Sequence, residues 1–466
     1  MTHDWQGVLQ LGFIGYFVAL NGGYLLLGIL SIRGLQRHSG DRSGIDDGAT
    51  YLGIEPPISL LVPAYNEEAT IRTSIRSMLQ LEYPDFELVV INDGSPDRTM
   101  DVLVREFGLV PYPGAVRIAL PHASVRGIYR STRHPNLRVI DKDNGGKADA
   151  LNAGINLARH GLFCAVDADS ILQRDSLLRL VRPFLDDGRT VAAGGTVRIA
   201  NGSRVRGGYL EQAGIPRNWL ARFQIVEYLR AFLFGRLGWT SMNALLIISA
   251  AFGLFDRRRV VDAGGYRHDT IGEDMELVVR LHRYHRERSI PYRITYVPDP
   301  VCWTEAPEDI GTLGRQRSRW QRGLSESLAL HAPWALGPRG GTAGWLAWPF
   351  MALFEWLGPL IEVAGYAFMF IGVALGAVSP VALAVFLVVA IGMGILLSVN
   401  GLLLESLAFR VYARKRDMVL LFSIAVLENF GYRQLNTLWR CRGLWQWAAR
   451  RKRNWGAMRR SGQWGQ

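Results

Sequence analysis

Short, continuous apolar runs alternate with helix-like stretches over residues 51–331. The runs are Ile58–Pro63, Phe86–Ile91, Leu137–Ile140 and Leu162–Val166. Each is followed by a helical pattern, as in "EEATIRTSIRSML" and "GKADALNAGINLARH". Buried strands that alternate with helices are typical of a parallel sheet covered by helices on both faces. The pattern therefore predicts an α/β domain with a mostly parallel, Rossmann-like sheet.

A longer apolar segment precedes this domain. Val8–Ile32 carries no charge and is long enough to span a bilayer, which takes about 20 apolar residues. It lacks the preceding basic residues and the small-residue cleavage site of a signal peptide, so we expect it to be retained. Arg33, Arg37 and Arg42 follow it, whereas no lysine or arginine precedes it. The positive-inside rule then places the N-terminus outside and the α/β domain in the cytosol.

Further membrane helices are predicted after the α/β domain. The Trp-rich segment Gly344–Trp356 predicts an interfacial helix, because tryptophan favours the headgroup layer. Spans are predicted at about Leu357–Val378 and Pro380–Phe409. Met418–Trp439 is interrupted by polar residues, and the basic tail beyond it should stay inside. We therefore interpret Met418–Trp439 as a re-entrant or interfacial helix, which makes three spans; a fourth span there is the alternative.

Composition narrows the class of protein. The 466 residues are 49% hydrophobic and 20% charged, which lies between a soluble enzyme and a pure membrane bundle. The formal net charge of +12 suits anionic lipid or an anionic substrate. Neither a zinc-like spacing nor an RNA-binding signature is present, so we expect no nucleic-acid partner. Cys164, Cys302 and Cys441 are far apart and predict no disulfide, as on a reducing cytosolic face.

Polar loops follow the predicted strands in succession. They read "PAYNEE", "NDGS", "DKDNGGK" and "DADS". One acidic loop after a strand usually only caps the next helix. Four such loops at the carboxyl ends of parallel strands indicate a ligand site, because ligands bind at that edge of an open α/β sheet.

Three of the polar segments suggest specific chemistry, although each alone is a weak signal. Asp167 and Asp169 could hold a hard divalent cation together with substrate phosphates. Asn144–Lys147 offers backbone amides and a lysine to a phosphate. Glu273 and Asp274 begin a predicted helix, where capping is the ordinary explanation. The alternative is a general base that takes a proton from an acceptor hydroxyl.

The motifs taken in order resemble a known family. "VPAYNEE", "NDGS", "NGGKADALNAG", "DADS", "GED" and "QRSRW" succeed one another over Ile58–Gly323. This series resembles the membrane-embedded processive enzymes of glycosyltransferase family 2, which include cellulose, chitin, hyaluronan and poly-N-acetylglucosamine synthases. The resemblance implies a GT-A fold, a UDP-sugar donor, a growing polysaccharide as acceptor and Mg²⁺ or Mn²⁺ as cofactor.

The resemblance also implies roles for individual residues. Those implied to hold the nucleotide sugar are Tyr65, Glu67, Asp93, Lys147, Asp167, Gln316 and Arg319. Those implied to act in catalysis are Asp274, as the general base, and its neighbour Glu273. Those implied to bind the acceptor are Trp320, by stacking on a sugar ring, Glu305 and Ser249. The metal is implied to lie on Asp169, with Asp167 beside it.

The basic residues around "QRSRW" have two interpretations. Arginines beside a bilayer ordinarily hold anionic lipid, and this stays open for Arg315, Arg317 and Arg322. Arg319 matches the family's Q-x-x-R-W motif and is expected instead to face the leaving diphosphate. Such a charge acts strongly only where water is excluded.

The product is less well defined by the sequence. "NGGKADALNAG" favours users of N-acetylglucosamine, whereas Met275 stands where chitin and hyaluronan synthases tend to place arginine. Three hypotheses follow: a processive polysaccharide synthase, a transferase that adds one sugar to a lipid carrier, and an inactive membrane receptor or scaffold. Q-x-x-R-W and the paired C-terminal spans favour the first.

The expected domain organisation follows from these hypotheses. Residues 1–50 form a membrane helix and linker, 51–331 a cytosolic GT-A domain, and 332–466 interfacial helices, spans and a basic tail. The expected location is a bacterial-type inner (plasma) membrane, crossed several times. Membrane lipid and small membrane or periplasmic subunits are the expected partners besides donor and acceptor.

Overall fold

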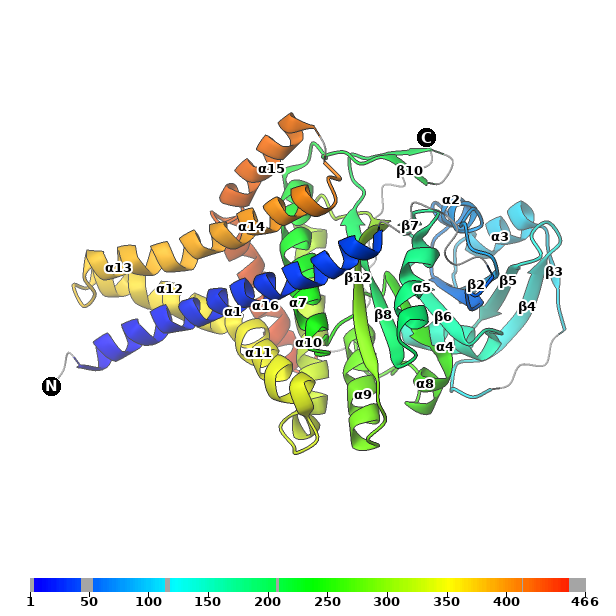
Figure 1. The fold of residues 1–466 in the computed structure, drawn as a ribbon, viewed down its shortest axis with the longest axis horizontal. Coiled ribbons are helices and arrows are strands. Elements are labelled where there is room, and N and C mark those ends of the chain that lie inside the picture. The colour runs from blue at the N-terminus through cyan, green and yellow to red at the C-terminus, as the bar shows by residue number, and fades with distance from the viewer. Residues whose placement is uncertain (1–3, 43–52, 114–117, 207–208, 413, 452–466) are drawn as a thin grey trace.

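The computed structural model describes residues 4–42, 53–113, 118–206, 209–412 and 414–451. The expected basic tail from Lys452 onward lies outside the described residues, as do the side chains of Arg33, Arg37 and Arg42. Figure 1 shows a twisted sheet with its helices at one end of the molecule and a group of long helices at the other.

A ten-stranded sheet forms the first part, in the order β3-β4-β5-β2-β1-β6-β11-β8-β12-β7. The predicted strands are β1 (Ile58–Ala64), β2 (Phe86–Asp93), β5 (Leu137–Lys142) and β6 (Leu162–Val166). These four run parallel to their neighbours in the set, which confirms the mostly parallel α/β sheet. The other strands are β3 (Leu109–Pro111), β4 (Val125–Ser131), β7 (Ile171–Leu172), β8 (Thr190–Ile199), β11 (Phe252–Asp256) and β12 (Arg293–Thr304). β11 runs antiparallel between β6 and β8.

Helices cover both faces of the sheet, as the continuous apolar strands require. Those packed along it are α2 (Ile71–Met78), α3 (Thr99–Phe107), α4 (Lys147–Leu157), α5 (Ser176–Asp186), α8 (Arg257–Asp262) and α9 (Glu273–Glu287). Successive side chains of a strand point to opposite faces, so Leu60 and Val62 join one core while Leu61 joins the other. A separate hairpin consists of β9 (Arg204–Arg206) and β10 (Tyr209–Gln212).

The second part contains the long apolar helices. They are α1 (Asp4–Arg42), α12 (Gly358–Ala374), α13 (Pro380–Leu387), η4 (Val388–Gly392) and α14 (Met393–Ala408). Trp5–Ile32 and Pro380–Ala408 are each long and apolar enough to cross a membrane. Ala343–Trp356 and Gly358–Ala374 form a pair bent by 45°, so the described residues offer two spans, or three if the bent pair is one span. The start of α1 and the α12–α13 turn lie at the same end, away from the sheet (Figure 1).

The bent pair covers the two segments for which an interfacial helix and a span are predicted, and these two roles stay predictions. Its first half consists of η2 (Ala343–Ala347), α11 (Trp348–Phe350) and η3 (Met351–Trp356). The single helix predicted at Met418–Trp439 is wrong in detail. The chain instead forms α15 (Lys415–Leu427) and α16 (Tyr432–Ala448), because Gly431, with φ of 97°, breaks the helical path.

A layer of helices separates the sheet from the apolar helices. It contains α6 (Trp219–Tyr228), η1 (Leu229–Phe234), α7 (Gly235–Ser241) and the long α10 (Ile310–Ala335). In Figure 1, α10 crosses the direction of the apolar helices. α10 carries "QRSRW", so this motif lies between the sheet and the candidate spans.

Candidate active site

The polar loops predicted from the sequence follow β1, β2, β5 and β6, at one edge of the sheet. Tyr65, after β1, exposes 49% of its surface. Glu67 is buried, and its carboxylate accepts a hydrogen bond of 2.5 Å from the Thr70 hydroxyl. Its backbone N–H donates to Thr99 Oγ1 at 2.9 Å. This first loop is therefore tied to the start of α3, while the Tyr65 ring faces outward.

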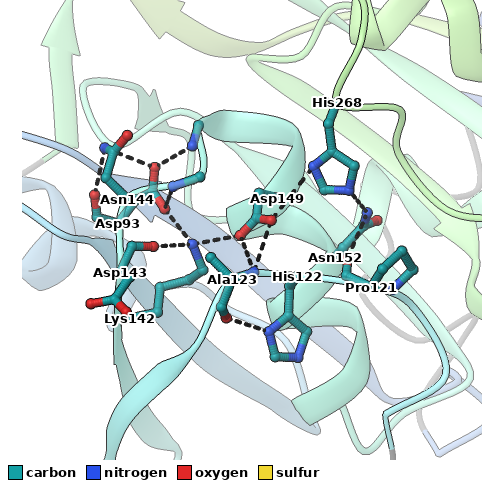
Figure 2. Close-up of polar contacts among 12 residues, drawn as sticks. Asp93, Pro121, His122, Ala123, Lys142, Asp143, Asn144, Asp149, Asn152 and His268 are labelled. Atoms are coloured by element: carbon teal, nitrogen blue, oxygen red, sulfur yellow. Dashed lines mark hydrogen bonds and ion pairs between the residues drawn. The ribbon is translucent and has the colours of Figure 1, made fainter.

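Asp93, at the end of β2, holds the glycine loop that precedes α4 (Figure 2). Its carboxylate accepts hydrogen bonds from the backbone N–H of Gly145 at 3.0 Å and of Gly146 at 2.8 Å. Asn144 also donates to it through its side-chain amide at 3.2 Å. The observed contacts of Asp93 hold the glycine loop in place. A contact between Asp93 and uridine stays a prediction.

Lys147 begins α4 and makes an ion pair with Asp167, at the end of β6. Burial lowers the pKa of the Lys147 ammonium, but the nearby carboxylates of Asp167, Glu273 and Asp274 outweigh burial and raise it. The lysine therefore stays charged between the carboxyl end of β6 and the start of α9.

Glu273 and Asp274 form the first turn of α9 and differ in environment. Glu273 is 5% exposed, and burial raises its pKa to about 7, against the lowering effect of Lys147. Asp274 raises the pKa of Glu273 further, while Arg319 lowers it. The half-buried Asp274 accepts a hydrogen bond of 3.3 Å from the backbone N–H of Ala250. Asp274 is thus the more accessible of the two carboxylates.

α10 brings the "QRSRW" side chains to the same place. Arg319 lies on α10, and its positive charge lowers the pKa of Glu273 in the acidic turn of α9. Gln316 is 9% exposed, and its Oε1 atom is buried with no hydrogen-bond partner among the described residues. The Trp320 ring, 37% exposed, lies 6.5 Å from the ring of Tyr228. This segment thus presents a cation, a buried amide and an aromatic face.

The lipid-binding interpretation is wrong for two of the three arginines to which it was applied. Arg317 is buried, pairs with Glu227 at 2.8 Å and lies 4.3 Å from the Trp320 ring centre. Arg322 is buried and pairs with Glu326 at 3.1 Å. Their side chains are held inside the protein because their helix is covered on several sides. Arg315 is exposed, and for it the interpretation stands as a prediction.

Two predicted acceptor-site residues lie next to strands that flank β8. Ser249 precedes β11, next to the amide of Ala250 that binds Asp274. Glu305 follows directly on β12, and is half-buried. β11 and β12 both pair with β8, so these residues come from one region of the sheet.

The chemistry of the "DADS" loop fits a divalent cation. Asp167 and Asp169 are two half-buried carboxylates, and Asp167 makes an ion pair with Lys147. Asp169, with Asp167 beside it, stays the predicted metal ligand. A cation there would need further oxygen atoms, since no group of three His, Cys, Asp or Glu side chains in the described part of the chain could hold one. Substrate phosphates commonly complete such sites.

α10 is anchored on two sides. On the sheet side, Glu326 accepts a hydrogen bond of 2.8 Å from the backbone N–H of Ile271, just before α9. On the other side α10 packs on α16, where a Cβ atom on Gly314 would lie 2.7 Å from the Trp439 indole nitrogen. A Cβ atom on Gly443 would overlap the Ser318 carbonyl oxygen. The two helices therefore approach closely through their glycines.

A polar contact that the sequence did not reveal joins α10 to the bend between Ala343–Trp356 and Gly358–Ala374. Gln321 donates hydrogen bonds to the carbonyls of Glu355 and Trp356, at 3.0 and 3.1 Å. Arg440 donates to Gln321 at 2.9 Å and to the Glu355 carboxylate at 2.8 Å. Charged residues within apolar helices were the available signal, because such residues are rare there without partners.

The fold and these strand-end loops are those of a GT-A glycosyltransferase. The sequence pattern of "Glycosyl transferase family 2" matches residues 59–233, and that of "Glycosyl transferase family group 2" matches residues 162–397, just over half of the chain. The chain belongs to glycosyltransferase family 2.

Curated relatives and a solved structure refine the comparison. Poly-beta-1,6-N-acetyl-D-glucosamine synthases of Staphylococcus epidermidis and Staphylococcus aureus (strain COL) are 30% identical over 272 residues, or 58% of this chain. The match spans 55% of those relatives, about half of their length. The mannosyltransferase PcManGT from Pyrobaculum calidifontis, solved with GDP-Man and Mn²⁺, superimposes with a TM-score of 0.53. It is 18% identical over 90% of this chain and 99% of its own, so the likeness concerns the fold.

Proposed function

We propose that this enzyme transfers a hexose from a UDP-sugar to a growing β-linked polysaccharide and passes the product across the membrane. N-acetylglucosamine is the preferred sugar, since the relatives named above are poly-N-acetylglucosamine synthases. The proposal keeps the expected domains: residues 1–50 as membrane helix and linker, 51–331 as a cytosolic catalytic domain, and 332–466 as interfacial and membrane helices.

The main support is the convergence of charges from separate parts of the chain. Lys147 is paired with Asp167 and lies within electrostatic reach of Glu273 and Asp274. Arg319, from α10, acts on Glu273 as well. Two cations beside three carboxylates suit a nucleotide diphosphate next to a proton acceptor. A scaffold protein has no need of such an arrangement.

The proposed reaction is a single displacement at the anomeric carbon. Asp274 accepts the proton of the acceptor hydroxyl, whose oxygen forms a bond to that carbon. The bond from the carbon to the UDP oxygen breaks, and UDP leaves with the electron pair. Arg319 and Lys147 stabilise the charge that develops on the diphosphate. One displacement inverts configuration, so an α-linked donor gives a β-linked product.

The remaining site residues take supporting roles in the proposal. Tyr65, Glu67 and Asp93 orient the uridine, and Gln316 contacts the pyrophosphate. Trp320 offers a flat apolar face to the acceptor sugar. Mg²⁺ or Mn²⁺ bound by Asp169, with Asp167 beside it, would supply positive charge to the diphosphate.

Donor-dependent UDP release from proteoliposomes tests the proposal. The donors are UDP-N-acetylglucosamine, UDP-glucose and UDP-glucuronate, each with Mg²⁺ or Mn²⁺, and the product is then sized. A polymer made from the first donor supports the proposal. A product longer by one sugar would indicate transfer to a lipid carrier instead. An absence of both UDP release and UDP binding would favour a receptor or scaffold.

Substitution of the proposed base tests the mechanism. Asp274→Asn should abolish turnover, because the amide cannot accept the proton, and should leave UDP binding nearly unchanged. Asp262→Asn is the matched control, because this exposed aspartate lies on α8 and only approaches Arg258 at 3.9 Å. Turnover that survives in Asp274→Asn would remove Asp274 from the role of base.

A further inference from the structure

Lys142 is a buried lysine that none of the roles above uses. It ends β5 and is 0% exposed. Its ammonium lies 2.5 Å from carboxylate oxygens of both Asp93 and Asp149, and it donates to the Asp143 carbonyl at 2.6 Å (Figure 2). An ammonium group has three hydrogens to donate, so these contacts use its full capacity.

The two carboxylates each hold a different backbone segment. Asp93 binds the amides of Gly145 and Gly146, in the loop that ends at Lys147. Asp149, on α4, accepts from the backbone N–H of Ala123 at 2.9 Å. A side chain on Gly145 would overlap the Asp149 carboxyl, so the glycine loop lies directly against this pair.

Asp149 also connects to the segment that leads to the proposed base. His268 Nδ1 lies 3.5 Å from Asp149 Oδ2. Asn152, one turn further along α4, donates to the Tyr266 carbonyl at 2.9 Å and accepts from its N–H at 2.8 Å. Residues 266–268 stand shortly before α9, which begins with Glu273. α4 therefore connects the glycine loop to the segment before α9.

The charges explain why a lysine is required at this position. Two carboxylates buried side by side repel one another and lose their hydration. Lys142 lies between Asp93 and Asp149 and offsets both effects. Without it, the two carboxylates repel one another and must move apart, which displaces the acceptors for the loop amides.

We propose that Lys142 is a positioning residue for donor binding, which holds the carboxylates of Asp93 and Asp149 side by side so that the glycine loop is preformed for the diphosphate. The inference rests on the proposed function, because it takes the loop as the donor site. Lys142 itself touches no substrate in this proposal. It acts through the loop that orients Lys147 beside Asp167.

The test compares three purified variants with the wild type by UDP binding and steady-state kinetics. Lys142→Met keeps the length of the side chain and removes the charge. It should raise the Kd for UDP and the KM for the donor by about 10- to 100-fold, the usual effect of losing a residue that orients a ligand-binding group from behind. Lys142→Met combined with Asp149→Asn should recover part of that loss, because the repulsion is relieved while Asp93 still binds the glycine amides. Lys415→Met, on the exposed start of α15, is the matched control.

The readouts separate a positioning role from a purely structural one. If Lys142 only stabilises the fold, Lys142→Met will melt at a lower temperature, yet its folded fraction will bind UDP with the wild-type Kd. That result would overturn the proposal, as would a double variant no better than the single one. If Lys142→Met does not fold, the Kd for UDP is measured for the double variant alone. A wild-type Kd in the double variant would also overturn the proposal. Failure of the wild type to bind UDP would count against the proposed function itself.

Discussion

Gly272 and Gly323 meet backbone against backbone. A Cβ atom on Gly272 would lie 2.9 Å from the carbonyl carbon of Gly323, and one on Gly323 would lie 2.9 Å from the Cα atom of Gly272. Gly272 directly precedes the acidic turn of α9, and Gly323 follows Trp320 by one turn of α10. This contact therefore sets the separation between the proposed base and the proposed acceptor platform.

Gly323→Ala should separate these two helices and slow turnover. We expect kcat to fall by roughly 100-fold, the effect of a misplacement of about 1 Å, with a smaller change in UDP binding. Gly235→Ala is the matched control, because a Cβ atom there would meet no atom within 4 Å. Steady-state kinetics and UDP titration check the prediction. Wild-type kcat in Gly323→Ala would show that the separation is not critical.

Glu273 should make the stability of the ligand-free enzyme depend on pH. Its folded-state pKa of about 7 lies above the ordinary 4.5, so the fold favours the protonated carboxyl. The stability that it contributes is complete below its unfolded pKa and is lost as the pH rises through about 7. Melting temperatures in detergent at about pH 5.5 and about pH 8.5 measure this loss.

Glu273→Gln should reduce the fall in melting temperature between these two pH values. Glu82→Gln provides the control, since this carboxylate is exposed and only approaches Arg174 at 3.7 Å. An identical pH dependence in Glu273→Gln and the wild type would contradict the prediction. Turnover is not the readout, so the result does not depend on the identity of the sugar.

Arg317 and Arg315 should differ sharply when each is replaced by methionine. Arg317→Met leaves the half-buried Glu227 carboxylate without the cation it pairs with, and removing one partner of a buried ion pair typically costs about 3–5 kcal/mol. Arg315→Met, at an exposed position two residues earlier, should change stability by about 0.5 kcal/mol or less. Denaturation in detergent measures both. Adding Glu227→Gln to Arg317→Met should restore part of the loss; similar stabilities for the two single variants would refute the ion pair's importance.

Removal of divalent cations should stop turnover. With EDTA we expect UDP release to cease, and Mg²⁺ or Mn²⁺ in excess should restore it, because the two carboxylates of the "DADS" loop suit a cation shared with phosphates. Asp169→Asn should raise the cation concentration needed for half-maximal rate. Full activity in EDTA would exclude a metal requirement.

The parallel core of the sheet was predictable from the sequence, whereas its outer half was not. β1, β2, β5 and β6 are continuous apolar runs, and burial on both faces produces that pattern. β8 contains Gly194 and Gly195, and the β12–β8 pairing shifts register near Pro300, so strand propensity is weak there. Strands such as β8 and β12 are recognised only in the folded chain, by their pairing with adjacent strands.

The candidate site shows the same division. Motif order singled out the carboxylates and Arg319 as candidates, because their spacing along the chain is characteristic, and their roles stay predictions. Lys142, Glu227 and Gln321 escaped notice, since a sequence does not tell a buried polar side chain from an exposed one. Their partners, Asp149, Tyr432 and Arg440 among them, lie on other elements and become evident only once the chain is folded.

The close packing of α10 between α9 and α16 has a consequence for the movement of a sugar chain through the enzyme. Gly323 on one side, and Gly314 and Gly443 on the other, bring this helix into close contact with both neighbours. The Trp320 ring is therefore carried by a helix that is packed on two sides. If the product grows by successive additions, the moving component is the saccharide, which must step past a fixed aromatic surface after each bond is made.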